Sequence, residues 1–308
     1  MSEHRWKPSP VLFLTALDLE YEAVRDQLSD IRRSPSVSKT RFEIGSLPGG
    51  AGDAILVLTG MGNQTSAVIT ERAVNFFKPA AVLLVGVAGR LKPKVSLGDI
   101  VVATHVYAYH GAAARAAGLA SRPRVWDIDH GIEQAAHQLS RRYGRDRGSR
   151  LSSEVPRVHF GPVASGEILH DAPTSDPLTW IKEHYEDAVA IEMEAAGVAK
   201  AGQLNSVPGA VVRAISDLAD GTKAQTDGED WQSRAVRNAA VFATTLAADL
   251  ANDRLSEATA AAAEDTSGIR VETYGGSHGA VAGVIRGGVH NSYPEGAPLS
   301  RSSERGWP

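Results

Sequence analysis

The sequence predicts an α/β fold in which helices lie on both sides of a largely buried sheet. Strand-like and helix-like segments alternate along most of the chain, a pattern typical of α/β proteins. One segment, AAVLLVGVAG at 80–89, is apolar throughout, as expected of a strand that is buried on both faces. The chain has 308 residues, 43% of them hydrophobic and 22% charged, which is enough for one sizeable core.

The expected elements follow from local sequence patterns. Short apolar runs bounded by glycine or proline predict strands, and apolar residues at helical spacing predict helices. The expected strands lie at 11–17, within 41–62 (two strands around a Gly/Pro turn), and at 80–89, 98–109, 158–166, 188–193 and 209–217. The expected helices lie at 19–28, 64–77, 132–144 and 231–252, and the region 111–156 is expected to be a loop followed by the third of these helices.

Composition changes after the last expected helix, which is predicted to close the core near Ala251. Residues 10–254 are expected to form the main domain, and residues 255–267 are small and polar, as in a linker. The next segment, 268–295, includes GGSHGAVAGVIRGGVHNS, in which Arg286 is the one charged residue. Residues 296–308 are expected to be a disordered tail.

Charge and cysteine content exclude several classes of function. The formal net charge is −4, so the sequence predicts no nucleic-acid partner and no binding to an anionic membrane. With no cysteine, disulfides, thiolate metal sites and a cysteine nucleophile are excluded, and a cytoplasmic location is expected. The ten histidines show no metal-ligand spacing, so no metal or other cofactor is expected. No signal peptide or membrane anchor is expected either.

The stretch VAIEMEAAG (189–197) places two carboxylates, Glu192 and Glu194, in a small, apolar run. On a helix, side chains two positions apart point about 200° away from each other, whereas on a strand they share a face. Here a strand pattern changes into a helix pattern at the two acids. Strand ends of this kind commonly form ligand crevices in α/β folds, so at least one acid is expected to face a pocket.

Two further acids follow strands in the same way. Asp217 ends the strand at 209–217, and Glu20 follows the first strand. Together with Glu192 and Glu194 they are expected to converge at one rim of the sheet.

Each acid also has a structural interpretation that the sequence leaves open. Glu192 and Glu194 are equally compatible with a buried ion pair to Arg213. Asp217 resembles an ordinary turn acid, with Ser216 as an alternative turn cap. Glu20 fits an exposed acid in a first helical turn, and Gly60-Met61-Gly62 fits a simple tight turn.

Six motifs, in this order, resemble those of the nucleoside phosphorylase and nucleosidase family, and most closely those of the methylthioadenosine/S-adenosylhomocysteine nucleosidases. The motifs are TALDLEYEAV, TGMGNQTSA, VGVAGRLKPKVSLGDIVVA, GPVASGE, AIEMEAAGVA and VVRAISDLAD, and they span about residues 10–250. The resemblance implies a three-layer αβα sandwich with a central mixed sheet, an N-glycosidic bond hydrolase acting on a purine nucleoside or nucleotide, and a homo-oligomer.

The resemblance also implies roles for individual residues. Cleavage of a ribosyl C–N bond passes through a cationic sugar, so the leaving purine needs a proton and the water needs a base. Asp217 is expected to protonate or hydrogen-bond N7 of the purine, and Glu20 to activate water. Glu194 is expected to bind the ribose hydroxyls while Met193 packs on the sugar. The other expected pocket residues are Glu192, Arg213, Ser216, Val87, Ala88, Gly89 and Leu169.

Water is the expected nucleophile, with phosphate as the alternative. A phosphorylase usually holds its phosphate with arginines. Neither GMGNQTS nor VLLVGVAG contains an arginine, and the first arginine after the second stretch is Arg90. Val87 stands where many of these nucleosidases have a small hydroxyl residue, and Leu169 where an aromatic commonly stacks on adenine. These departures leave the purine substrate open.

The segment 268–295 resembles bacterial amyloid signalling motifs, which couple an effector domain to an NLR-like sensor with a matching motif. This resemblance implies an effector of a bacterial defence system. The alternatives are a purine nucleoside phosphorylase, or a methylthioadenosine/S-adenosylhomocysteine salvage enzyme with an inert glycine-rich tail. A purely structural or binding role for the whole chain is a further alternative.

Overall fold

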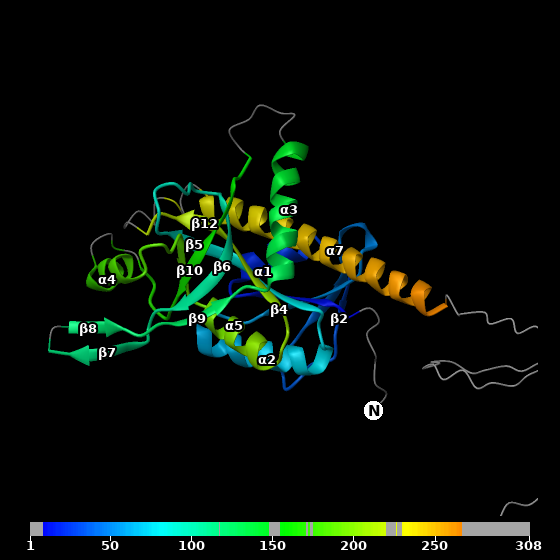
Figure 1. Cartoon of the computed structure of the whole chain (residues 1–308), viewed down its shortest axis with the longest axis horizontal. Helices are drawn as coiled ribbons and strands as arrows, with labels where there is room; N and C mark the ends of the chain where they lie inside the picture. The colour runs from blue at the N-terminus through cyan, green and yellow to red at the C-terminus, as the bar shows by residue number, and fades with distance from the viewer. Residues whose placement is uncertain are drawn as a thin grey trace, which may run out of the picture. The chain divides into compact units, whose positions relative to one another are not determined.

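A computed structural model describes residues 9–116, 118–147, 155–170, 172, 175–219, 226 and 230–266, without the side chains of 144–147 and 257–266. These residues form a mixed sheet with helices on both faces, which confirms the predicted fold class (Figure 1). None of the described helices is long and apolar enough to cross a membrane.

The main sheet has the strand order β11-β10-β6-β12-β5-β1-β4-β3-β2, with β9 paired to β6. Its strands are β1 (Val11–Thr15), β2 (Ser29–Arg33), β3 (Glu43–Ser46), β4 (Asp53–Leu58), β5 (Ala81–Arg90), β6 (Ile100–Ala108), β9 (Arg124–Asp127), β10 (Val158–Ser165), β11 (Ala190–Glu192) and β12 (Gly209–Asp217). The central strands β12, β5, β1 and β4 are mutually parallel. Because β11 also pairs with β5, strands β11, β10, β6, β12 and β5 form a closed ring at one side of the sheet.

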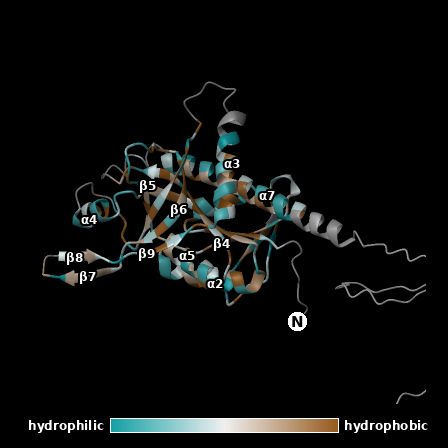
Figure 2. Cartoon of the chain, viewed as in Figure 1, coloured by the Kyte–Doolittle hydropathy of each residue, from teal (hydrophilic) through white to brown (hydrophobic). Residues whose placement is uncertain are grey.

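Alternating side chains of the central strands supply two hydrophobic layers. In β1, Val11 and Phe13 pack into one cluster, and Leu12 and Leu14 into the other. This two-residue alternation places successive side chains on opposite faces of the sheet. Both faces are apolar, and Figure 2 shows the central strands as hydrophobic.

The helices divide between these two layers. They are α1 (Asp18–Arg25), α2 (Asn63–Phe77), α3 (His130–Arg147), α4 (Asp176–His184), α5 (Ala195–Leu204) and α7 (Trp231–Thr266), with a short 3-10 turn at Pro48–Gly50. Helices α1, α3 and α7 supply one cluster, and α2 and α5 supply the other. A third, smaller cluster holds Leu178 and Ile181 of α4.

Two sequence-based expectations are wrong. The region expected to be a loop before α3 contains the hairpin β7 (Ala112–Arg115) and β8 (Gly118–Ser121), followed by β9. The last helix, predicted to end near Ala251, continues to Thr266 and so includes most of the expected linker at 255–267. The segment 268–295 and the tail 296–308 lie outside the described residues.

Candidate active site

A cavity of about 260 Å³ lies at the carboxyl ends of β5, β11 and β12. It brings together all the predicted site residues except Arg213. These are Glu20, Val87, Ala88, Gly89, Leu169, Glu192, Met193, Glu194, Ser216 and Asp217. The remaining lining residues are Ala16, Leu17, Met61, Ile168, His170, Ile191 and Gln232.

The strand register explains this convergence. Strands β5 and β12 are parallel neighbours, and Gly89 pairs with Asp217. Glu192 ends β11, and Glu194 is the N-cap residue of α5. The two acids therefore lie at a strand-to-helix junction, as predicted. Glu20 reaches the same place from the first turn of α1.

Arg213 lies beneath the cavity and joins three of the carboxylates. Its side chain is fully buried. Nη2 donates to Glu192 Oε2 and, at 2.9 Å, to Glu194 Oε2. Nη1 lies 3.6 Å from Glu20 Oε1. The predicted ion pair is thus present, and it is a cluster of one guanidinium with three acids.

Glu192 and Glu194 have different surroundings. Both oxygens of Glu192 accept hydrogen bonds from the first backbone N–H groups of α5, at 3.0 to 3.1 Å, in addition to the bond from Arg213. Among the described residues, each Glu194 oxygen accepts one hydrogen bond, Oε2 from Arg213 and Oε1 from the Gly62 N–H at 3.0 Å. A carboxylate has about four acceptor positions, so Glu194 keeps more capacity for a ligand than Glu192.

Glu20 is only 1% exposed and is fixed from two sides. Its Oε2 accepts the backbone N–H groups of Ala16 and Leu17 at 2.8 and 3.0 Å, and its Oε1 accepts that of Val87 at 2.8 Å. The carboxylate therefore links the residues that follow β1 to the carboxyl-terminal half of β5. The alternative of an exposed first-turn acid is wrong.

Asp217 borders the cavity at the end of β12. Its Oδ1 accepts the N–H of Ala219 at 3.0 Å, and its Oδ2 accepts the hydroxyl of Ser216 at 3.2 Å. A Cβ atom at Gly89 would lie 3.0 Å from Asp217 Oδ1. The missing side chain at Gly89 thus permits the close approach of the Asp217 carboxylate.

The corner Gly60-Met61-Gly62 is part of the site. Gly62 has a φ of +100°, which favours glycine, and this conformation presents its N–H to Glu194. The next residue, Asn63, accepts the N–H of Gly197 at 2.9 Å. These bonds fix the start of α2 against the start of α5.

Burial and charge shift two pKa values in the cluster. Burial raises the pKa of Glu194 to about 7, against the opposing effect of the Arg213 guanidinium. Burial by itself would lower the pKa of Arg213, but Glu192, Glu194 and Glu20 outweigh it and raise that pKa above its usual range. Three carboxylates around one guanidinium thus favour retention of a proton by Glu194 near neutral pH.

Three of the lining residues are apolar and exposed. Leu169 and Met61 are each 65% exposed, and Ile168 is 41% exposed. His170 follows Leu169 directly but is buried. Sequence spacing gave no indication that this histidine enters the cavity.

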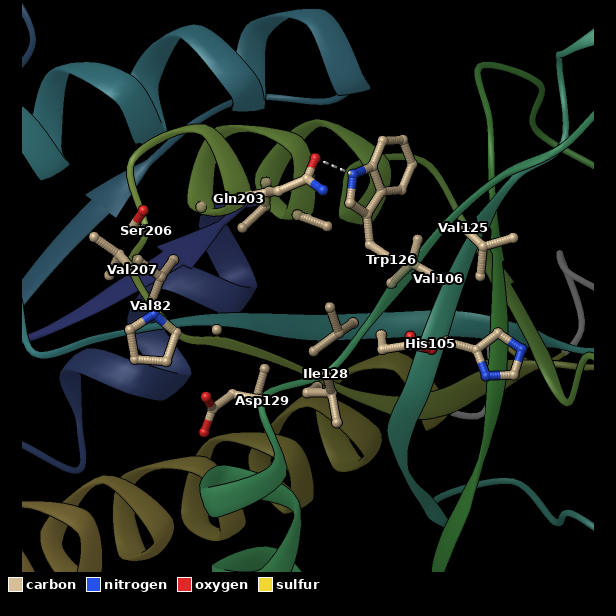
Figure 3. A pocket seen from close by; sticks show the side chains of 18 residues that line it. Val82, His105, Val106, Val125, Trp126, Ile128, Asp129, Gln203, Ser206 and Val207 are labelled. Carbon is tan, nitrogen blue, oxygen red and sulfur yellow. Dashed lines mark hydrogen bonds between the residues drawn. The ribbon is translucent and has the colours of Figure 1, made fainter.

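A larger cavity of about 510 Å³ lies near the amino ends of β5 and β12 (Figure 3). Its polar groups are largely engaged or exposed. Trp126 Nε1 donates to Gln203 Oε1 at 3.1 Å, the dashed line in Figure 3. Asp129 is exposed and accepts the N–H of Ile132 at 3.1 Å, near the start of α3. The lining of this larger cavity includes none of the buried carboxylates found in the smaller cavity.

The chain is similar to a known protein family and to several known proteins. The family described as the phosphorylase superfamily matches residues 10–248. "ATP nucleosidase Cap17" of Escherichia coli strain KTE188 is 31% identical over 236 residues, which cover 69% of this chain and 46% of that protein. A 5'-methylthioadenosine/S-adenosylhomocysteine nucleosidase of Staphylococcus epidermidis is 27% identical over 241 residues, which cover 76% of this chain and 97% of that protein.

A solved structure has the same fold. The 5'-methylthioadenosine/S-adenosylhomocysteine nucleosidase of Neisseria meningitidis superposes with a TM-score of 0.66 at 23% identity, covering 78% of this chain and 99% of that one. The present chain spans about half the length of the Cap17 relative.

Proposed function

Because the chain belongs to the phosphorylase superfamily, we propose that it hydrolyses the N-glycosidic bond of an adenine nucleoside or nucleotide. The relatives named above are an ATP nucleosidase and a methylthioadenosine/S-adenosylhomocysteine nucleosidase. The main structural support is the convergence of Glu20, Glu194 and Asp217 on one cavity.

The proposed chemistry assigns one task to each acid. Asp217 gives a proton to N7 of the purine, so that the base leaves as a neutral molecule. Glu194 accepts hydrogen bonds from the ribose hydroxyls, and Met193 packs on the sugar. Glu20 orients and deprotonates the attacking water. All three acids border the space in which the cationic sugar forms, where negative charge stabilises the transition state.

Arg213 and Glu192 support this arrangement from below. Without the guanidinium, three carboxylates would repel one another in a buried place. Glu192 binds the first N–H groups of α5 and so fixes Glu194, the N-cap residue of that helix. These two residues are proposed as positioning residues.

Water is the proposed nucleophile, and phosphate is the alternative. Among the described residues that line the cavity, none is an arginine or lysine. Arg213 already forms ion pairs with three acids. A phosphate dianion usually needs such cations, so the described surroundings support hydrolysis.

The proposal leaves open which chemical group the substrate has at its 5′ position. The exposed rim residues Leu169 and Met61 offer an apolar surface rather than an aromatic stack. Incubation with adenosine, methylthioadenosine, S-adenosylhomocysteine, AMP and ATP identifies the substrate. Free adenine is expected without phosphate, whereas an absolute phosphate requirement would establish the alternative.

Asp217→Asn tests the acid directly. We expect a loss on the order of 10²-fold in turnover with unchanged folding, because the amide cannot deliver a proton. Asp53→Asn, on β4 and outside the cavity, is the matched control. Near-normal turnover of folded Asp217→Asn would refute the assignment.

A 2′-deoxy substrate tests Glu194. Loss of a charge-assisted hydrogen bond to the sugar is expected to lower kcat/KM by the equivalent of about 1.5 to 3 kcal/mol. Equal kcat/KM for adenosine and 2′-deoxyadenosine would show that Glu194 does not bind the 2′-hydroxyl.

We further propose a cytoplasmic homo-oligomer that serves as the effector of an NLR-like defence system. The support is the resemblance of the segment 268–295 to amyloid signalling motifs. The isolated peptide 268–295 is expected to form thioflavin-positive fibrils, and Val284→Asp with Ile285→Asp to prevent them by stacking like charges. A peptide that stays soluble, even when seeded with the matching sensor segment, contradicts the signalling role.

A further inference from the structure

One buried aspartate outside the acid cluster has no role in the chemistry proposed above. Asp99 lies directly before β6 and is only 6% exposed. It belongs to the lining of neither cavity described above. A buried carboxylate needs hydrogen bonds that replace its lost contacts with water. The bonds that Asp99 makes therefore indicate which parts of the fold it holds together.

The Asp99 side chain joins two segments of the chain. Its Oδ2 accepts the backbone N–H of Ser96 at 2.9 Å, which closes a turn at residues 96–99. Its Oδ1 accepts the backbone N–H of Arg157 at 2.9 Å, and His159 Nε2 lies 2.9 Å from Oδ2. Arg157 immediately precedes β10, and His159 is the second residue of that strand. The carboxylate thus fixes the 96–99 turn against the start of β10.

The backbone of the same turn holds the end of β12. The Ile215 N–H donates to the Asp99 carbonyl at 2.9 Å, and the Gly98 N–H donates to the Ile215 carbonyl at 2.8 Å. These two bonds extend the antiparallel pairing of β12 with β6. Ile215 lies two residues before Asp217, so the turn supports β12 close to the proposed acid.

Strand β12 is irregular at this point. On its other side it pairs with β5, where Ile215 is opposite Ala88 and Asp217 is opposite Gly89. Ser216 is therefore an extra residue, as in a β-bulge, and a bulge redirects the side chains that follow it. Because an extra residue disrupts the ladder of hydrogen bonds locally, the geometry of the bulge depends on the contacts on either side of it.

We propose that Asp99 is a positioning residue for Asp217. This inference rests on the proposed function, in which Asp217 gives a proton to N7 of the purine. The Asp99 carboxylate closes the turn, the turn holds Ile215, and Ile215 determines where the bulge begins. A general acid must lie within hydrogen-bond reach of the atom that it protonates. A displacement of about 1 Å caused by a distant substitution can lower the rate about 10²-fold.

Helix α7 holds the same turn independently of the Asp99 side chain. Asn238 Nδ2 donates to the Gly98 carbonyl at 2.9 Å. Gly98 has a φ of +82°, which favours glycine, and a Cβ atom there would lie 3.4 Å from the Trp231 ring. A substitution at Asn238 therefore loosens the turn without touching Asp99.

Steady-state release of adenine by the full chain tests the inference. Asp99→Asn keeps the size of the side chain but places an amide NH2 where a donor now meets an acceptor. We expect kcat to fall about 10-fold to 100-fold with KM within about twofold, because the sugar-binding residues stay in place. Asn238→Ala should lower kcat in the same way, by about threefold to tenfold. Asp129→Ala, which removes a hydrogen bond to the Ile132 N–H near the start of α3, is the control and should lower the melting temperature without changing kcat.

The same substitutions in the Asp217→Asn background separate positioning from a merely structural role. If Asp99 and Asn238 act through Asp217, neither Asp99→Asn nor Asn238→Ala should lower the residual kcat of Asp217→Asn by more than about twofold. A merely structural role would multiply the losses, so that each substitution would cost the same factor in both backgrounds.

Three outcomes would overturn the inference. They are a kcat of folded Asp99→Asn within about twofold of the wild type, a change in KM alone, or equal losses in the two backgrounds. If Asp99→Asn does not fold, Asn238→Ala decides by the same criteria. A wild type that releases no adenine would refute the proposed function together with this inference, whereas an active wild type with fully active variants would refute the inference alone.

Discussion

Insertion of one methyl group at Gly86 should separate the ion pair beneath the active site. Gly86 lies on β5 and pairs with Arg213 on β12. A Cβ atom built there would lie 2.2 Å from Arg213 Nη1 and 2.2 Å from Glu20 Oε1. These two atoms are 3.6 Å apart, so the methyl group of Gly86→Ala would occupy the space between them.

The size of the effect follows from these distances. Cβ contacts below 3.0 Å are essentially never observed, so each charged group must move by roughly 1 Å in a packed interior. Such movement strains the core and weakens the bond from the Val87 N–H to Glu20. Overpacking and a weakened charge-assisted hydrogen bond together predict a loss of about 2–4 kcal/mol in the free energy of unfolding.

Urea denaturation and thermal melting measure this loss. For a domain of this size the melting temperature should fall by roughly 5–15 °C, and turnover should fall as well because Glu20 is displaced. Gly131→Ala is the control, since Gly131 is exposed near the start of α3, where alanine favours the helix. A Gly86→Ala protein with the wild-type melting curve would refute the proposed packing.

Three further predictions concern stability. Burial raises the pKa of Glu194 from 4.5 to about 7, so the stability contributed by its protonated form is full below pH 4.5 and is lost as the pH rises through 7. Between these pH values the free energy of unfolding of Glu194→Gln should therefore rise relative to that of the wild type by about 3 kcal/mol. Urea denaturation that gives the two proteins the same pH dependence of stability would contradict this prediction. Arg213→Met should cost about 3–5 kcal/mol at neutral pH in urea denaturation, because three buried carboxylates lose their cation; a cost below 1 kcal/mol would show that the acids do not depend on it. Deletion of residues 268–308 should leave turnover and melting temperature nearly unchanged, since the described core on α7 ends near Ala251, and a large drop in either would assign the tail a structural role.

The sequence predicted the central strands and the convergence of acids well. Strands β1, β5 and β12 are apolar runs bounded by turn residues, so their type follows from local patterns. The carboxyl ends of the parallel strands β1, β5 and β12 meet at one edge, which brings Glu20 and Asp217 together. Glu194 reaches the same cavity from β11, which pairs antiparallel with β5.

The hairpin before α3 and the extension of α7 were missed for physical reasons. The hairpin β7 and β8 consists largely of exposed or half-buried small residues, so it has no apolar alternation to detect. The expected linker is rich in alanine, which is the best helix former, and α7 extends through it to Thr266. The small side chains of residues 255–267 were interpreted as a sign of a flexible linker. His170 was missed because the loop that brings it to the cavity follows no repeating pattern.

The three backbone donors on Glu20 have a stereochemical consequence. A carboxylate offers about four acceptor positions, and the N–H groups of Ala16, Leu17 and Val87 occupy three of them. Under the proposed hydrolysis, one direction remains from which a water molecule can give its proton to Glu20. The water then reaches the anomeric carbon from a single face of the ribose, and the newly released sugar should have one anomeric configuration, visible by NMR before mutarotation.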